Sequence, residues 1–276
     1  ALARVLKRRG APCVSIVEPA FSEYALACRL AGLESSPLWS GIGSGADGQP
    51  SGDLLAGLAA INIIKAVWQR TRFDDMLTAA GADRVLTMDL HASQIQGFFD
   101  IPVDNLAGNP IFVDYYAKKY GSECENMMVV SPDVGSVSRA RAFAQKLHMN
   151  LAIVDKRRQK ANSCEVMNVI GDVRGKDCIL FDDLVDTAGS LCNAATALME
   201  VGGAKSVQAC ASHGVLSGPA IDRINDSVIT ELALLDTIPA IDPKKSSKIK
   251  YLQVAPMFAE AIERIYQEIS ISKLFR

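Results

Sequence analysis

The sequence lacks any pair of cysteines at the spacing of a zinc site or a redox motif. Its seven cysteines are scattered, their number is odd, and no Cys-x-x-Cys occurs among them. Neither a disulfide framework nor a zinc site is therefore indicated. Reduced thiols in a cytoplasmic protein are the simplest interpretation.

Long apolar runs and a strong charge of either sign are missing too. The most apolar stretch, residues 54–64, is too short to span a bilayer, and the start shows no signal-peptide pattern, so no membrane association is expected. The formal net charge of −2 disfavours a role that rests on non-specific nucleic-acid binding. A compact anionic ligand remains open, because a few cations and backbone amides suffice to bind one.

The chain has enough apolar residues for a sizeable core. Of its 276 residues 49% are hydrophobic, which suits one large or two modest α/β domains. The first 73 residues are irregular: a strand is expected at 13–17, a Gly-, Ser- and Pro-rich linker at 36–52 and a buried helix at 53–68. Residues 43–48 fit G-x-G-x-x-G, but no strand precedes them, so a linker is favoured over a dinucleotide site.

From residue 81 the pattern becomes regular, because short apolar runs alternate with helical patterns. This alternation predicts an α/β fold with a mainly parallel sheet that is covered on both faces. Ligands bind beyond the carboxyl ends of the strands in such sheets. Strands are predicted at 84–88, 127–130, 151–154, 178–181, 206–211, 229–235 and 248–254, and helices at 138–147, 190–201 and 256–267.

The strongest motif follows the predicted strand 178–181 and leads into the predicted helix 190–201. It opens with Asp182 and Asp183, two adjacent carboxylates that suit the vicinal hydroxyls of a ribose or a hydrated Mg²⁺. Helix capping would explain one or two of the residues that follow, but not the whole series. They offer hydroxyls, small side chains and successive N–H groups for a phosphate monoester: Asp186, Thr187, Ala188, Gly189 and Ser190.

Three further polar features follow predicted strands. One is a turn whose N–H groups can face a pyrophosphate, made of Asp133, Val134, Gly135 and Ser136. From the residues alone, this turn is about as well explained by simple helix capping as by a binding site. A cationic cluster stands at 155–160, where a charge run is usually a solvated face. His91 follows the strand 84–88, and a lone histidine is more often structural than functional.

Together these segments resemble one family. Residues 182–190 are similar to the phosphoribosyl-pyrophosphate-binding motif shared by type I phosphoribosyltransferases and by the ribose-phosphate diphosphokinases that make their substrate. The resemblance covers about residues 75–275. The diphosphokinases in particular are resembled by residues 88–100, 131–135, 155–158 and 214–219.

The resemblance implies a fold and an activity. The fold is two phosphoribosyltransferase-like α/β domains, residues 1–106 and 107–276, with the first atypical or incomplete and the final helix and tail as candidates for packing on it. The activity is transfer of pyrophosphate from ATP to ribose 5-phosphate, which gives phosphoribosyl pyrophosphate and AMP for nucleotide biosynthesis. Members assemble into rings, commonly hexamers, so a homo-oligomer is expected.

The resemblance also implies roles for single residues. Lys156 and Arg158 would stabilise charge on the transferring pyrophosphoryl group. His91 and Asp133 would approach Mg²⁺ bound to the nucleotide phosphates, and contact of His91 through water is favoured because Mg²⁺ prefers oxygen. Ser136 stands where many members have Gly, so its Cβ could restrict the backbone of the pyrophosphate turn.

The resemblance fails in the N-terminal part. Neither a Phe-(Ser/Asp)-Asp-Gly-Glu motif nor a Tyr-Ala-Arg-Gln-Asp-Arg segment of the nucleotide site occurs. A divergent, truncated or wrongly assembled segment would each explain this, and the sequence does not choose among them. ATP turnover by this chain alone is therefore expected to be weak or absent. Two alternatives stay open, a non-catalytic regulatory subunit of the same family and a phosphoribosyltransferase.

Overall fold

The computed structural model describes residues 14–16, 77, 82–121, 126–157 and 166–275. Contacts divide the chain into two compact units. The first comprises Ala1–Gly108, Thr237–Pro239 and Gln253–Arg276, and the second comprises Asn109–Asp236 and Ala240–Leu252. The linker expected at 36–52, its G-x-G-x-x-G match and the helix expected at 53–68 lie outside the described residues.

The described part of the first unit holds a three-stranded parallel sheet in the order β1-β2-β3. Its strands β1 (Val14–Ile16) and β2 (Arg84–Met88) lie where the sequence predicted them, whereas β3 (Val103–Leu106) was not predicted. Four successive residues of β2, from Val85 to Met88, are buried without alternation between buried and exposed positions, as in sheets that are covered on both faces.

Helical segments complete the first unit. They are η1 (Ser93–Phe98), α10 (Ala255–Tyr266) and η4 (Ser272–Phe275). α10 confirms the helix predicted at 256–267: its buried residues Phe258, Ala261 and Ile262 stand at the spacing of one helix face. Among the described residues, no helix combines the length and the apolar character that crossing a bilayer requires.

The second unit forms, within its described residues, a seven-stranded sheet in the order β10-β9-β8-β7-β4-β5-β6. The neighbouring strands are parallel except β5 and β6, which are antiparallel. The predicted α/β fold with mainly parallel sheets is therefore confirmed. The strands are β4 (Met127–Ser131), β5 (Asn150–Arg157), β6 (Val166–Ile170), β7 (Asp177–Val185), β8 (Ser206–Gly214), β9 (Ile229–Leu235) and β10 (Ile249–Leu252).

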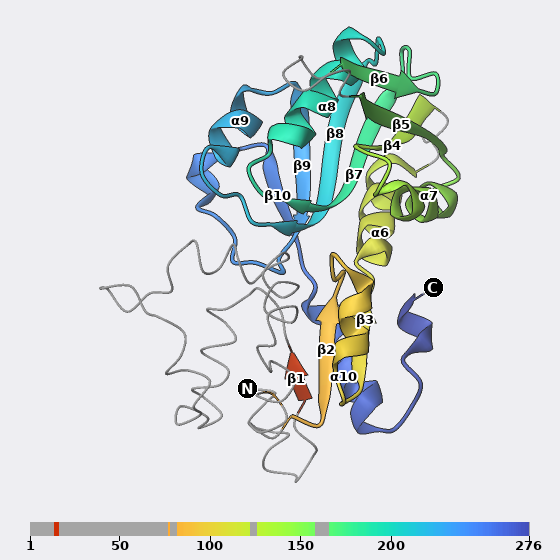
Figure 1. Ribbon diagram of the computed structural model, residues 1–276, viewed down its shortest axis with the longest axis vertical. Helices are drawn as coiled ribbons and strands as arrows, with labels where there is room; N and C mark the ends of the chain where they lie inside the picture. Colours follow the sequence, from red (N-terminus) through yellow and green to blue (C-terminus); the bar gives the residue numbers. More distant parts are fainter. Residues whose placement is uncertain (1–13, 17–76, 78–81, 122–125, 158–165, 276) are drawn as a thin grey trace. The chain divides into compact units, whose positions relative to one another are not determined.

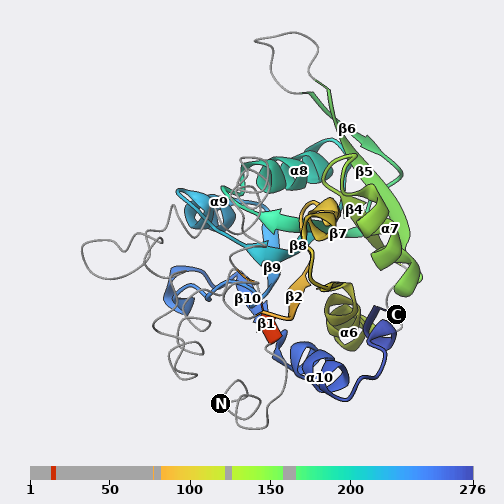
Figure 2. The same cartoon turned by 60° about the horizontal axis from the view of Figure 1, so that its bottom comes forward.

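Helices cover both faces of this sheet (Figure 1 and Figure 2). α8 (Gly189–Glu200) and α9 (Ala220–Asp226) lie on one face, and α6 (Asn109–Tyr120) and α7 (Val137–Lys146) on the other; a short 3-10 turn, η3 (Pro243–Lys245), precedes β10. On the first face α8 buries Leu191, Ala194, Ala195 and Leu198 in the main core. On the second, the rings of Phe112, Phe143 and Phe181 pack together.

α6 was not predicted, because only Phe112 and Tyr116 of its residues are buried. Its remaining ties to the sheet are polar and depend on the tertiary structure. The Tyr115 hydroxyl donates to Glu231 of β9 at 2.7 Å, and Lys119 Nζ donates to Gln208 of β8 at 2.8 Å. Polar contacts of this kind do not produce a regular spacing of hydrophobic residues, so the sequence pattern did not indicate the helix.

Three strands, β5, β7 and β8, run three or more residues past the ends that their apolar residues predicted. β7 pairs with β8 as far as Val185, so Asp182 and Asp183 are strand residues and do not follow the strand. β5 pairs with the antiparallel β6, which brings Lys156 into the ladder opposite Met167. The predicted strand ends at 181 and 154 were therefore wrong, because a neighbouring strand supplies backbone partners beyond the hydrophobic run.

Candidate functional site

The loop between β7 and α8 turns the chain directly from strand into helix. Asp186 and Thr187 are exposed, and α8 begins at Gly189. Ala188, which lies between Thr187 and Gly189, has a φ of 60°, a left-handed conformation that costs a residue with a side chain about 1–2 kcal/mol. The first N–H groups of a helix have no acceptor within the helix, so this end of α8 suits an anionic group.

The segment after β8 holds this loop in place. The Ser217 N–H donates to the Asp186 carbonyl at 3.1 Å, and the Leu216 N–H donates to the Val185 carbonyl at 3.1 Å. The Ser217 hydroxyl also donates to the Asp186 carboxylate. Asp186 is thus oriented by a neighbour from the segment 214–219, which the sequence had linked to the same family.

The two adjacent carboxylates of β7 have different surroundings. Asp183 is 4% exposed and forms an ion pair with Arg139 of α7. Asp182 accepts from the Ser136 hydroxyl at 3.1 Å and from the Asp183 N–H at 2.9 Å. Burial raises the pKa of Asp182 to about 7, and the negative charges of Asp183 and Asp133 contribute to this increase. The pair therefore combines a buried, ion-paired carboxylate with one whose pKa is raised by burial.

The turn between β4 and α7 is closed by its own side chains. The Ser136 N–H donates to Asp133 Oδ1 at 2.9 Å, and the Ser131 hydroxyl donates to the Asp133 carbonyl at 2.7 Å. Val134 at the tip is 69% exposed. A Cβ at Gly135 would lie 3.3 Å from Asp133 Oδ1, so a larger residue there would require a small shift of the Asp133 carboxylate. Ser136 has an ordinary right-handed backbone, with φ −87° and ψ −1°, and its Cβ is accommodated.

The candidate metal ligands belong to different units. His91 lies just after β2 in the first unit, and Asp133 lies after β4 in the second. The turn that carries His91 is fixed by the Gly108 N–H, which donates to Asp89 Oδ2 at 3.0 Å. Within the described residues, no three His, Cys, Asp or Glu side chains gather into a metal-binding group. Arg158 and the side chain of Lys156 lie outside the described part of the chain.

The sequence did not single out Arg139 or Arg223. Arg139 stands in the first turn of α7 and reaches Asp183; Arg223 stands on α9, and its Nη1 donates to the Thr187 carbonyl at 2.9 Å. Neither belongs to a polar run that would have drawn attention to it. Only their partners, which come from other parts of the chain, reveal them.

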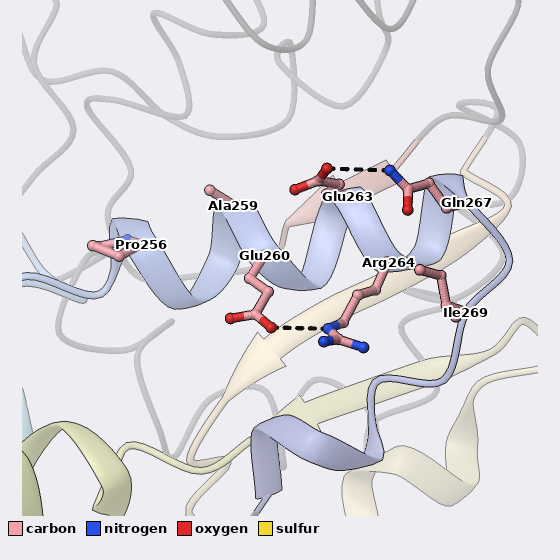
Figure 3. A pocket seen from close by; sticks show the side chains of 7 residues that line it. All are labelled: Pro256, Ala259, Glu260, Glu263, Arg264, Gln267 and Ile269. Carbon is pink, nitrogen blue, oxygen red and sulfur yellow. Dashed lines mark hydrogen bonds and ion pairs between the residues drawn. The ribbon is translucent and has the colours of Figure 1, made fainter.

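A hollow along α10 in the first unit does not belong to this site (Figure 3). Two pairs of its side chains are joined to each other: Arg264 Nε donates to Glu260 at 2.9 Å, and Gln267 Nε2 donates to Glu263 at 3.1 Å. No residue of the sequence-based site lines it. The lining residues are Pro256, Ala259, Glu260, Glu263, Arg264, Gln267 and Ile269.

The second unit is thus an α/β domain whose central strand β7 carries a pair of adjacent carboxylates and leads into a loop that suits an anionic group. Known proteins are similar to it in sequence and fold. A family model described as a phosphoribosyl synthetase-associated domain matches residues 157–276. A ribose-phosphate pyrophosphokinase of Clostridium tetani is 62% identical over 201 residues, which cover 73% of this chain and 62% of that protein. One from Caldanaerobacter subterraneus subsp. tengcongensis is 60% identical over 201 residues, 73% of this chain and 63% of that protein.

A solved structure agrees with these relatives. The crystal structure of phosphoribosylpyrophosphate synthetase from Mycobacterium smegmatis matches with a TM-score of 0.65 and 32% identity, over 97% of this chain and 76% of that one. The chain belongs to the ribose-phosphate pyrophosphokinase family, which the sequence resemblance had indicated. It spans less than two thirds of the length of the curated relatives named above, 62% and 63%.

Proposed function

We propose that the protein transfers pyrophosphate from ATP to ribose 5-phosphate, which yields phosphoribosyl pyrophosphate and AMP. The observation that carries the proposal is the loop from Asp186 to the start of α8. It joins an exposed turn to a helix N-terminus directly after the carboxylate pair of β7. The carboxylates can accept hydrogen bonds from sugar hydroxyls and the helix N-terminus can donate to a phosphate, and family membership supports the assignment.

The proposed roles follow the order of the substrate's groups. Asp182 and Asp183 bind the ribose hydroxyls, and residues 186–190 hold the 5-phosphate. The anomeric hydroxyl attacks the β-phosphorus of ATP and releases its proton, while the bond from that phosphorus to the α-phosphate oxygen breaks. Lys156 and Arg158 stabilise the charge of the transition state, since such transfers depend on positioning and electrostatics.

Mg²⁺ is the proposed cofactor, with Asp133 and His91 as its candidate protein partners. Mg²⁺ at a nucleotide site keeps several waters and needs only one or two carboxylates besides the substrate phosphates. Asp133 fits this requirement, because its carboxylate is exposed and uses Oδ1 for the Ser136 N–H. When bound, the metal would screen the phosphate charges that otherwise oppose attack.

The proposal extends to assembly and place of action. We expect a homo-oligomer, a hexameric ring by family resemblance, in the cytoplasm, where Cys178, Cys192 and Cys210, the free thiols of the described part, would stay reduced. We also propose that the two compact units correspond to the two domains expected from the sequence. ATP and ribose 5-phosphate are the proposed partners, and neither nucleic acid nor membrane is among them.

AMP formation by the purified chain with Mg²⁺, ATP and ribose 5-phosphate tests the proposal. Because the family's N-terminal nucleotide motifs are missing from the sequence, we expect slow turnover alone and faster turnover with a complete homologous subunit. The second candidate is a regulatory subunit. It would be supported if this chain still stimulates the complete subunit after the carboxylate pair of its β7 has been replaced. Consumption of phosphoribosyl pyrophosphate with a nucleobase, without AMP release from ATP, would contradict both.

A further inference from the structure

The loop that joins β7 to α8, residues 186–190, is called the phosphate loop below. Three successive carbonyls, at the end of β7 and in this loop, accept hydrogen bonds from the part of the chain that follows β8. The carbonyls of Val185 and Asp186 accept from the N–H groups of Leu216 and Ser217, each at 3.1 Å. The third, that of Thr187, accepts from a side chain, Arg223 Nη1 at 2.9 Å. The chain after β8 thus supplies a row of donors that continues from backbone into guanidinium.

Fixing these carbonyls also fixes the N–H groups of the loop. In a trans peptide the C=O of one residue and the N–H of the next point in opposite directions. No cis peptide bond occurs among the described residues. The Thr187 carbonyl points toward Arg223, so the Ala188 N–H points away from α9. By the same reasoning, the N–H groups of Asp186 and Thr187 point away from Leu216 and Ser217.

The Thr187 peptide needs this support more than its neighbours. Ala188 has a φ of 60°, which a residue with a side chain rarely adopts. The backbone donors that hold the two preceding carbonyls end at Ser217, so the last carbonyl before the helix depends on Arg223. The Arg223 guanidinium is also close to Gly189, since a Cβ on Gly189 would lie 3.4 Å from Arg223 Nη1.

Arg223 is itself held by the short helix that carries it. Lys248 Nζ donates to three carbonyls at the end of α9, those of Ile224 at 3.1 Å, Asn225 at 2.9 Å and Ser227 at 2.7 Å. A cation there supplies partners for carbonyls that lack them within the helix, and it interacts favourably with the negative end of the helix dipole. Ile224 beside Arg223 is fully buried in the main core. The backbone that carries Arg223 is therefore fixed before any ligand binds.

We propose that Arg223 is a positioning residue of the phosphate loop, which holds the Thr187 carbonyl and so directs the Ala188 N–H at the 5-phosphate of the sugar. The proposal rests on the function proposed above and adds a residue to it. It predicts that Arg223 affects recognition of ribose 5-phosphate and leaves ATP binding unchanged.

Calorimetry with ribose 5-phosphate on the full chain tests this role. Arg223→Ala should weaken binding about tenfold or more, as expected when a hydrogen bond from a charged donor is lost. Arg223→Lys, which keeps a donor, should stay within about threefold of wild type, and added guanidinium should restore part of the affinity of Arg223→Ala. The control is Arg141→Ala, which removes an exposed arginine from α7 and should bind as wild type does. Thermal unfolding of each variant separates a folding defect from a binding defect.

The outcomes separate this proposal from the proposed function. A wild-type chain that binds no ribose 5-phosphate overturns both. Wild-type binding with an Arg223→Ala affinity within about twofold overturns only the role of Arg223. If Arg223→Lys and guanidinium restore affinity, positioning is supported. If Arg223→Gln loses as much as Arg223→Ala and the variants lose the salt dependence of wild type, Arg223 pairs with the phosphate directly, and positioning is overturned.

Discussion

Arg139 in the first turn of α7 forms an ion pair with Asp183 in the middle of the second unit's sheet. The carboxylate is 4% exposed and the guanidinium 34%. In the same turn, the Ser136 hydroxyl donates to Asp182 at 3.1 Å. The N-terminal end of α7, with its N-cap Ser136, thus contacts the two adjacent carboxylates of β7 and links the proposed pyrophosphate turn to the proposed ribose site.

Arg139→Ala should lower the free energy of unfolding by about 2–3 kcal/mol, because it removes the cation that is ion-paired with a buried carboxylate. Urea denaturation at neutral pH measures the change. Arg141→Ala, an exposed arginine on the same helix, is the matched control and should stay within about 0.5 kcal/mol of wild type. The double variant Arg139→Ala/Asp183→Asn should recover part of the loss. An Arg139→Ala protein as stable as the control would contradict the ion pair.

The stability of the wild type should fall as pH rises, relative to Asp182→Asn. Burial, with the charges of Asp183 and Asp133, raises the pKa of Asp182 from an ordinary value of 3.8 to about 7. The folded state thus holds a proton that the unfolded state releases, so the contribution of this group decreases between these two values and is constant above. Urea denaturation of both proteins from pH 4 to pH 8, without divalent cations, checks the sign. A stability difference that does not change with pH would refute the raised pKa.

Asp186→Ala and Thr187→Val should weaken ribose 5-phosphate binding by about 1.5–3 kcal/mol without unfolding the protein. Both side chains are exposed in the loop after β7, so the core does not depend on them. Ser217→Ala is an informative companion, because the Ser217 hydroxyl donates to Asp186 and its loss should free that carboxylate. Calorimetry gives the affinities, and unchanged values in both loop variants would remove these residues from the site.

Lys156→Ala and Arg158→Ala should lower kcat far more than the affinity for either substrate. Their proposed contribution is made in the transition state, where charge develops on the transferring group. The measurement is steady-state AMP formation, with the complete homologous subunit present if the chain alone is too slow. A rise in KM with kcat unchanged would mean that these cations only bind substrate.

Local patterns predicted much of the fold. Strand β9 was predicted with its observed limits, Ile229–Leu235, because five of its seven residues are apolar and polar turns stand on either side. Helix α8 lies within one residue of its predicted limits, 190–201, and buries Leu191, Ala194, Ala195 and Leu198. Val201, the last residue of the predicted helix, follows the end of α8 at Glu200 and is 63% exposed.

The sequence by itself determined most of the strands, the helices α7, α8 and α10, the mainly parallel sheet and the family, because hydrophobic period and motif order are properties of neighbouring residues. The tertiary structure alone decided where β7 ends, since the ladder with β8 continues past the apolar run to Val185. It also decided that Asp183 is ion-paired and that burial raises the pKa of Asp182, and it brought Arg223 to the Thr187 carbonyl. Each of these depends on a partner from a distant part of the chain. Contacts of this kind are not reflected in the pattern of residues next to either partner in the sequence.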